Sequence, residues 1–156
     1  MRVLAVDIGT VRTGFAVSDP LGLTAQPLPT VEGGSAKVNA KAIADVVEKY
    51  AAEASEARRV GTVVIGDPIQ LNGKKGEKSA VSAECARLLE EYLRQRIAYP
   101  VKVVLRDERF TSVAAERCML ESDASRKHRK EKKDQLAAQL ILENYLESRR
   151  CKNASE

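Results

Sequence analysis

The chain has 156 residues, 44% hydrophobic and 31% charged, with nine glycines, five prolines and a net charge of +4. This composition excludes a low-complexity or disordered chain, and the length suits one domain with one buried core. The sequence lacks both the ~20 consecutive apolar residues of a membrane span and a signal peptide, because the amino-terminal apolar run reaches Asp7 too early. We therefore expect an intracellular, cytoplasmic protein with no membrane partner.

The first third of the chain is typical of antiparallel strands. Residues 2–8 form a nearly unbroken apolar run, which predicts a strand covered on both faces. A turn over residues 9–14 and a second apolar run over 15–18 predict a hairpin. Residues 24–31 predict a third strand, placed at an edge because two prolines interrupt it.

The rest of the chain alternates between helical and strand patterns. We expect helices over 35–57 and 78–97, strands over 60–65 and 101–105, and two last helices over 111–122 and 131–149, separated by a basic segment. This order predicts an α/β fold with a mixed five-stranded sheet, three antiparallel strands followed by parallel ones, flanked by helices. One domain would span residues 1–150, and residues 151–156 would form a frayed, disordered tail.

The cysteines and the histidine limit the possible chemistry. Cys85, Cys118 and Cys151 are far apart and form no Cys-x-x-Cys pair, so we expect all three to be reduced and structural. His128, the single histidine, lies in a basic run. Nucleophilic catalysis that relies on histidine and histidine-based zinc chemistry are therefore disfavoured. Hydrolysis would have to rely on carboxylates and hard metal ions.

Several carboxylates fall where they could meet at one site. Asp7 lies in the first strand, where an uncompensated buried carboxylate costs several kcal/mol. Asp107 and Glu108 directly follow the last strand, and Asp134 shares a helical face with apolar residues three, four and seven positions later. One or two Mg²⁺ or Mn²⁺ ions would hold such acids together, and paired ions cleave phosphodiester bonds without a histidine.

Each of these acids also has a purely structural interpretation. Asp7 could form a salt bridge with Arg12 or cap nearby backbone amides, and Asp107 could be a turn residue that faces solvent. Glu108 could be half of an ion pair, and Asp134 could stabilise the first turn of a helix through the macrodipole.

The basic residues are concentrated in one segment. Residues 126–133 hold six basic residues and one acidic residue, whereas the remainder of the chain is slightly acidic. Such a block is either a solvated, mobile stretch or the place where a polyanion docks.

Three motifs resemble those of one known family. Residues 6–22, from Val6-Asp7-Ile8-Gly9-Thr10 onwards, are similar to the first motif of the YqgF family, also called RuvX. Asp-Glu-Arg-Phe-Thr-Ser at 107–112 resembles its Asp-Glu-Arg-x-Thr-Thr signature, and residues 125–142 resemble its C-terminal segment. The resemblance covers residues 2–149, with the motifs in the family order.

This resemblance implies a ribonuclease H-like fold and a metal-dependent nuclease that processes the 5′ end of the 16S ribosomal RNA precursor. It implies catalytic, Mg²⁺- or Mn²⁺-binding carboxylates at Asp7, Glu108 and Asp134, with Asp107 as a further candidate. It also implies residues that contact the phosphates of a structured nucleic acid: Arg12, Arg109, Thr111, Arg126, Lys127, Arg129 and Lys130.

The chain departs from the family pattern after the fourth strand. Where members commonly have Gly-Leu-Pro, this sequence has Gly66-Asp67-Pro68, and a later Asp-Gly reads Asn72-Gly73. Related RuvC resolvases carry an acidic metal ligand near this strand end. Our hypothesis is that Asp67 is a supplementary metal ligand or an outer group of the site, the alternative being a solvent-exposed loop acid.

Other functions remain open from the sequence. A Holliday junction resolvase would act on branched DNA in place of precursor RNA, and it should be a two-fold homodimer, whereas an RNA nuclease could be a monomer. A non-catalytic nucleic-acid-binding protein is a second alternative. Asp7-Ile8-Gly9-Thr10 also resembles a phosphate loop of actin-like and sugar kinases, but the second loop and second domain that they need are missing.

Overall fold

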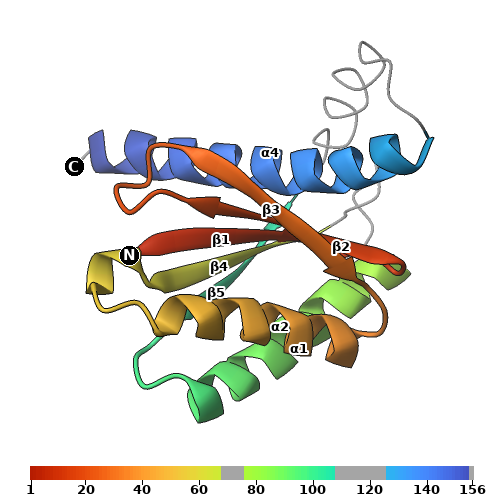
Figure 1. The fold of residues 1–156 in the computed structure, drawn as a ribbon, viewed down its shortest axis with the longest axis horizontal. Helices are drawn as coiled ribbons and strands as arrows, with labels where there is room; N and C mark the ends of the chain where they lie inside the picture. The colour runs from red at the N-terminus through yellow and green to blue at the C-terminus, as the bar shows by residue number, and fades with distance from the viewer. Residues whose placement is uncertain (68–75, 108–125, 155–156) are drawn as a thin grey trace.

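The fold is a five-stranded mixed sheet between two helical layers (Figure 1). The computed structural model describes residues 1–67, 76–107 and 126–154, with residues 126–131 described by their backbone only. The strands are β1 (Arg2–Asp7), β2 (Arg12–Ser18), β3 (Ala25–Glu32), β4 (Val60–Asp67) and β5 (Lys102–Asp107). The described helices are α1 (Ala36–Ala51), α2 (Glu77–Arg96) and α4 (Arg126–Ala154), with a short 3₁₀ helix over Glu56–Arg58.

The sheet topology brings three strand ends to one edge. The strand order is β3-β2-β1-β4-β5, with β1 antiparallel to β2 and parallel to β4, and β4 parallel to β5. The carboxyl ends of β1, β4 and β5 therefore lie together, at the right of Figure 1, away from the C-terminus of α4. This arrangement confirms the predicted α/β fold with three antiparallel strands followed by parallel ones.

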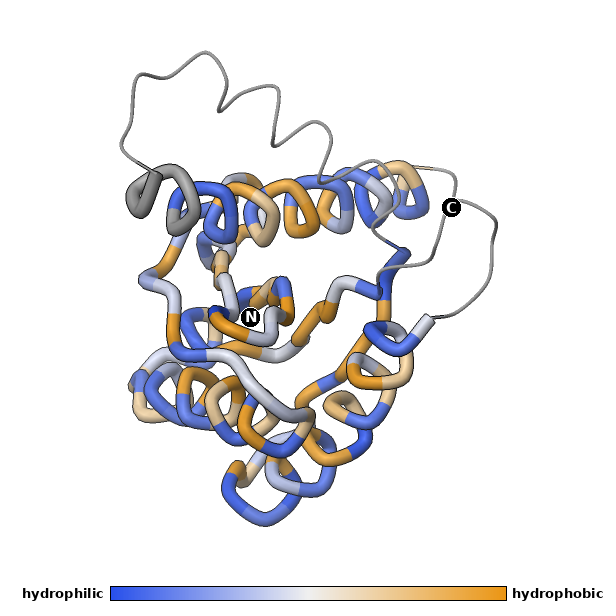
Figure 2. Tube along the Cα trace, turned by 90° about the vertical axis from the view of Figure 1, so that its right-hand side faces the viewer, coloured by the Kyte–Doolittle hydropathy of each residue, from blue (hydrophilic) through white to orange (hydrophobic). Residues whose placement is uncertain are grey.

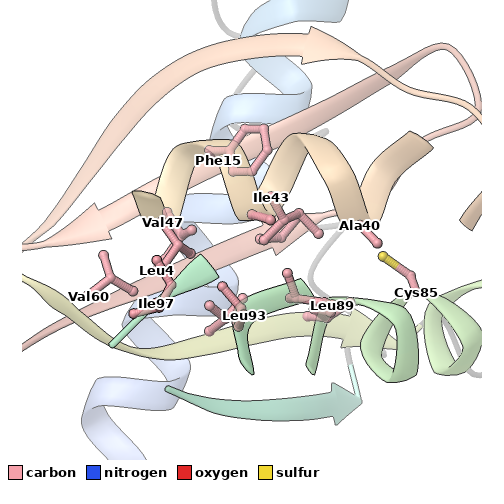
Figure 3. Close-up of a cluster of buried hydrophobic side chains, with 14 of the residues drawn as sticks. Leu4, Phe15, Ala40, Ile43, Val47, Val60, Cys85, Leu89, Leu93 and Ile97 are labelled. Atoms are coloured by element: carbon pink, nitrogen blue, oxygen red, sulfur yellow. The ribbon is translucent and has the colours of Figure 1, made fainter. Parts of the chain in front are cut away.

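The alternation of side chains along the strands builds one apolar cluster on each face of the sheet. The larger cluster packs under α1 and α2, and Figure 3 shows Leu4 and Phe15 of the sheet facing Ile43 and Val47 of α1. The smaller cluster, the α4-side cluster, packs under α4 and consists of Val3, Ala5, Ala16, Val64, Ala138, Ile141, Leu142 and Leu146. Blue and orange residues alternate along α4 in Figure 2, as expected of a helix with one buried face.

A buried polar contact joins β2 to the first helix. Thr13 Oγ1 donates to Asn39 Oδ1 at 2.8 Å, and Asn39 Nδ2 donates to the Gly34 carbonyl at 3.0 Å. Both Thr13 and Asn39 are completely buried. Because a buried polar group must be hydrogen-bonded to avoid a desolvation penalty, this pair fixes the start of α1 against the start of β2.

The last helix corrects two predictions. Residues 126–154 form one continuous helix, so the basic segment does not separate two helices and residues 151–154 are not a disordered tail. Lys and Arg are good helix formers, and cations in the last turn favour the negative end of the helix macrodipole. Arg150 Nη2 also donates to the Leu23 carbonyl at 3.1 Å, which ties the helix end to the β2–β3 turn.

Smaller differences concern element ends. The first helix ends at Ala51 rather than at residue 57, because the chain turns back toward β4 and Arg59 Nε binds the Glu53 carbonyl. β2 begins at Arg12, within the predicted turn. The predicted helix over 111–122 lies outside the described residues.

The cysteines differ in environment. Cys85 is buried in the core, and burial raises the pKa of its thiol to about 12. Cys151 is exposed in the last turns of α4, and Cys118 lies outside the described residues. None of the helices in the described part of the chain is both long and apolar enough to cross a membrane.

Asp19 organises the turn between β2 and β3. Its carboxylate accepts hydrogen bonds from the backbone of Leu21, Leu23 and Thr24, at 2.7–3.0 Å, and from the Thr24 hydroxyl. These bonds, that from the Thr24 amide foremost, lower the pKa of Asp19 from 3.8 to about 2. The carboxylate form therefore stabilises the folded state.

We predict that Asp19→Asn lowers the melting temperature at pH 7, because the amide is a weaker acceptor than the carboxylate. The stabilisation by Asp19 is present above the unfolded pKa of 3.8 and is lost as the pH falls toward 2. The difference in melting temperature between variant and wild type should therefore shrink below pH 4 in circular dichroism melts. A difference that stays constant down to pH 3 would contradict this role.

Candidate active site

Asp7 ends β1 on the face covered by α4. Val3 and Ala5 of the same strand belong to the α4-side cluster, and alternation places Asp7, two residues further, on that face. Asp7 is partly exposed and lies opposite Gly14 of β2 in the antiparallel register. It is therefore at the carboxyl edge of the sheet, as the sequence predicts.

Asp134 reaches the same place because α4 packs closely on β2. A Cβ atom on Gly14 would overlap the backbone carbonyl of Asp134 and would lie 3.3 Å from the Asp134 Cβ. The helix then continues over the sheet through the buried residues Ala138 and Ile141. Gly14 is thus in contact with Asp134 and paired with Asp7, so the structure brings these two predicted acids to one face of the sheet.

The helix around Asp134 corrects one alternative interpretation. Because α4 begins at Arg126, Asp134 lies in its third turn and not in its first. The stabilisation of an acid by the macrodipole falls off within the first turn. Stabilisation of the first helical turn through the macrodipole therefore does not explain Asp134.

A cleft of about 480 Å³ opens beside Asp134. Part of the lining comes from the loop between β1 and β2, part comes from the first turns of α2, and Asp134 belongs to the lining as well. The lining residues are Ile8, Gly9, Thr10, Val11, Arg12, Gly34, Glu77, Lys78, Val81, Ser82 and Asp134. The volume falls within the range of ~300–1,000 Å³ that is usual for ligand sites.

The loop wall is held by close backbone packing. A Cβ on Gly9 would overlap the Arg12 carbonyl, and the Gly33 amide donates to the Val11 carbonyl at 2.9 Å. Arg12, one of the predicted phosphate-contacting residues, lines the cleft and is partly exposed. A guanidinium there suits contacts with phosphate oxygens.

Asp67 lies on the other face of the sheet. It is the last residue of β4, is 7% exposed, and accepts a 2.6 Å hydrogen bond from the hydroxyl of Ser79 in α2. Val63 and Ile65 belong to the cluster under α1 and α2, and Asp67 follows them in the alternation. The interpretation of Asp67 as a solvent-exposed loop acid is therefore wrong, and its carboxylate is directed toward α2 rather than toward Asp7.

Asp107 ends β5 next to Asp67 in the parallel register, and it is exposed. The preceding residue, Arg106, donates to the Ser148 hydroxyl and the Asn144 carbonyl of α4. Alternation therefore turns Asp107 away from α4. Among the residues that the structure describes, no three His, Cys, Asp or Glu side chains are grouped to hold a metal ion.

For the remaining predicted site residues, the structure does not describe the side chains. Glu108, Arg109 and Thr111 lie outside the described residues. The predicted basic contacts lie in the first turns of α4, where only the backbone is described: Arg126, Lys127, Arg129 and Lys130.

Two cleft residues and one anchoring residue were missed by the sequence reasoning. Glu77 and Lys78 line the cleft, and Ser79 binds Asp67. A signal for Lys78 was present, because it precedes Val81 by three residues and thus continues the apolar stripe of its helix. Ser79 left no signal, since its partner is 12 residues away in another element.

The family model that matches this chain is RuvX, described as Holliday junction resolvase, over residues 1–148. The chain belongs to the RuvX family. A relative from Geobacillus sp. (strain WCH70), named "Putative pre-16S rRNA nuclease", is 37% identical, with 96% of this chain and 99% of the relative covered. A relative of the same name from Clostridium botulinum (strain Hall) is 39% identical, with 95% and 98% covered.

The solved structures that resemble this RuvX member show the fold. RuvC from Thermus thermophilus in complex with a Holliday junction substrate superposes with a TM-score of 0.54 at 16% identity over 96% of each chain. A second Thermus thermophilus RuvC structure gives a TM-score of 0.50 at the same identity and coverage. The predicted ribonuclease H-like fold is therefore confirmed.

We predict that Gly14→Ala destabilises this RuvX member by about 1–3 kcal/mol, because the new methyl group forces α4 away from β2. The melting temperature should fall by roughly 3–10 °C in calorimetry. Gly61→Ala is the matched control, since a Cβ there meets mainly the flexible side chain of Met1. Equal effects of the two substitutions would argue against a tight contact at Gly14.

We predict that Ser79→Ala lowers the free energy of unfolding by about 1–3 kcal/mol in urea titrations, because a buried Asp67 carboxylate loses a hydrogen-bond donor. Ser79→Thr, which keeps the hydroxyl, should lower the free energy of unfolding less.

If Asp67 is instead a metal ligand, Asp67→Asn should weaken Mg²⁺ binding in calorimetric titrations. Unchanged metal affinity would leave Asp67 with the anchoring role alone.

Proposed function

We propose that this protein is a metal-dependent nuclease that hydrolyses phosphodiester bonds of structured RNA and processes the 5′ end of the 16S ribosomal RNA precursor. The observation that supports it most is the placement of Asp7 and Asp134 on one face of the sheet, around Gly14, beside a cleft. The names of the two relatives favour ribosomal precursor RNA over DNA.

The donor set suits a hard cation. Asp7 and Asp134 offer carboxylate oxygens, which Mg²⁺ and Mn²⁺ prefer, and the described residues that line the cleft include no histidine or cysteine that would favour a softer metal. Glu108, which follows β5 directly in the sequence, is the third ligand that we propose. A bound Mg²⁺ or Mn²⁺ would supply a Lewis acid for the phosphate and a nucleophile from water at neutral pH.

The chain's own residues would orient the substrate. Arg12 presents a guanidinium at the cleft, and the first turns of α4 bring Arg126, Lys127, Arg129 and Lys130 into the same helix as Asp134. Arginine can contact phosphate in a bidentate way, whereas lysine acts as a point charge. Arg109 and Thr111 complete the proposed phosphate contacts by their place in the Asp-Glu-Arg motif.

A second candidate function is Holliday junction resolution. It is favoured by the description of the matching family and by the RuvC fold. The same carboxylates would cut two strands of a four-way DNA junction, which requires a two-fold dimer with two sites.

We predict that the wild type cleaves end-labelled RNA carrying the 16S precursor leader in the presence of Mg²⁺ or Mn²⁺. Asp7→Asn and Asp134→Asn should each slow cleavage by about 100-fold or more, because the cation loses a charged ligand. Asp45→Asn is the control, since Asp45 is an exposed residue of α1 whose ion pair with Arg96 lies on the surface.

The outcomes distinguish the candidate functions. Cleavage of a synthetic four-way DNA junction but not of the RNA, by a dimeric protein, would favour the resolvase. Binding of either substrate without cleavage, equal in wild type and Asp7→Asn, would favour a non-catalytic nucleic-acid-binding protein and overturn the proposal.

A further inference from the structure

The lining of the cleft beside Asp134 includes a second basic residue besides Arg12, and it comes from α2. Lys78 lies in the first turn of α2 and lines the cleft together with Arg12. Lys78, Val81 and Ser82 are spaced by three and four residues, so they share one face of the helix. Val81 and Ser82 line the cleft as well, and Cys85, one turn further, is buried in the core. The stripe of α2 that faces inward therefore begins with a lysine.

The start of α2 is fixed against the sheet by two serines, Ser82 on this stripe and Ser79 next to Lys78. The Ser79 hydroxyl donates to the buried Asp67 carboxylate at 2.6 Å, and the Ser82 hydroxyl donates to the Gly66 carbonyl at 3.3 Å. Ser79 and Ser82 are themselves 2% and 1% exposed. The first turn of a helix that lacks a side-chain N-cap would otherwise fray easily, and Gly76 provides no such cap here. The two serines thus hold the backbone of Lys78 at the cleft wall.

The acidic and basic residues around the cleft come from different elements. Asp134 lies on the side covered by α4, whereas Arg12 and Lys78 come from the loop wall and from the α2 wall. A phosphodiester that approaches the carboxylates needs positive charge on the walls away from them to offset repulsion. Glu77 also lines the α2 wall. Among the described lining residues, Lys78 is the one lysine or arginine that α2 contributes.

We propose that Lys78 contacts a backbone phosphate of the nucleic-acid substrate and, together with Arg12, positions the strand across the cleft from Asp134. This inference rests on the proposed function for the identity of the ligand as a polynucleotide. Lys78 is a positioning residue here: its ammonium group supplies a point charge for binding, and the carboxylates perform the chemistry.

The test compares two substitutions with opposite charge effects on the same helical turn. Lys78→Gln should weaken binding of the precursor RNA about 3–10-fold in fluorescence anisotropy, and Glu77→Gln should tighten it, because it removes a negative charge from the same wall. All variants carry Asp7→Asn so that the RNA is not consumed. Lys49→Gln, an exposed lysine near the far end of α1, is the matched control and should change nothing.

The salt dependence gives an independent readout. Loss of one phosphate contact lowers the slope of log affinity against log salt concentration by about 0.7–0.9, whereas a merely structural defect need not change it. Lys78→Gln should show this lower slope with an unchanged melting temperature. Equal affinities and slopes for Lys78→Gln and Lys49→Gln would overturn the inference, as would weaker binding by both Lys78→Gln and Glu77→Gln.

The inference and the proposed function can fail separately. If the protein with Asp7 intact binds the RNA but does not cut it, while Lys78→Gln lowers affinity and slope, the nuclease proposal fails and the phosphate contact stands. If the RNA is cut in a manner that depends on Asp7, while Lys78→Gln binds like the control, the nuclease stands and the role of Lys78 fails.

Discussion

The close contact between α4 and β2 at Gly14 is the constraint on which the rest of the site depends. A glycine at this position lets the helix backbone lie directly on the strand, and the apolar face of α4 beyond it holds the helix down through Ala138 and Ile141. Because Gly14 pairs with Asp7, the height of the helix above the sheet also sets how near Asp134 comes to Asp7. One close approach thus sets both the packing of α4 on the sheet and the separation of the two carboxylates, and it depends on the absence of a side chain at Gly14.

The sheet divides the acidic residues at its carboxyl edge between two environments. On the α4 side, Asp7 and Asp134 are partly exposed, so that water reaches them. On the α2 side, Asp67 is buried and bound by Ser79, so its charge contributes to the attachment of α2. Alternation along the strand is sufficient to separate these roles, because neighbouring residues point to opposite faces. Acids that are close in the fold therefore need not share a ligand.

The sequence was most informative where a periodic pattern coincided with a structural layer. The buried run of β1 and the helical spacing that follows Asp134 predicted which strand and which helix face meet, and the structure agrees. The prediction that the basic segment lies outside the last helix was wrong, since like charge alone does not prevent a segment with good helix propensity from being helical. The environment of Asp67 was not predictable, because it depends on Ser79, a partner in another element with no recognisable motif. The place of Lys78 depends on the same tertiary packing.

Because α4 is continuous, the orientation of its basic first turns around the helix axis is fixed relative to Asp134. Asp134 follows Arg126 by eight positions of uninterrupted helix, about 12 Å along the axis at 1.5 Å per residue. The two parts of this continuous helix cannot rotate independently. Insertion of one residue between Arg126 and Asp134 would rotate the basic turns by about 100° around the helix axis relative to the Asp134 carboxylate. The relative orientation of the basic turns and Asp134 is therefore set by the length of this segment and not by its composition: exchange of one basic residue for another keeps that orientation, whereas an insertion or a deletion changes it.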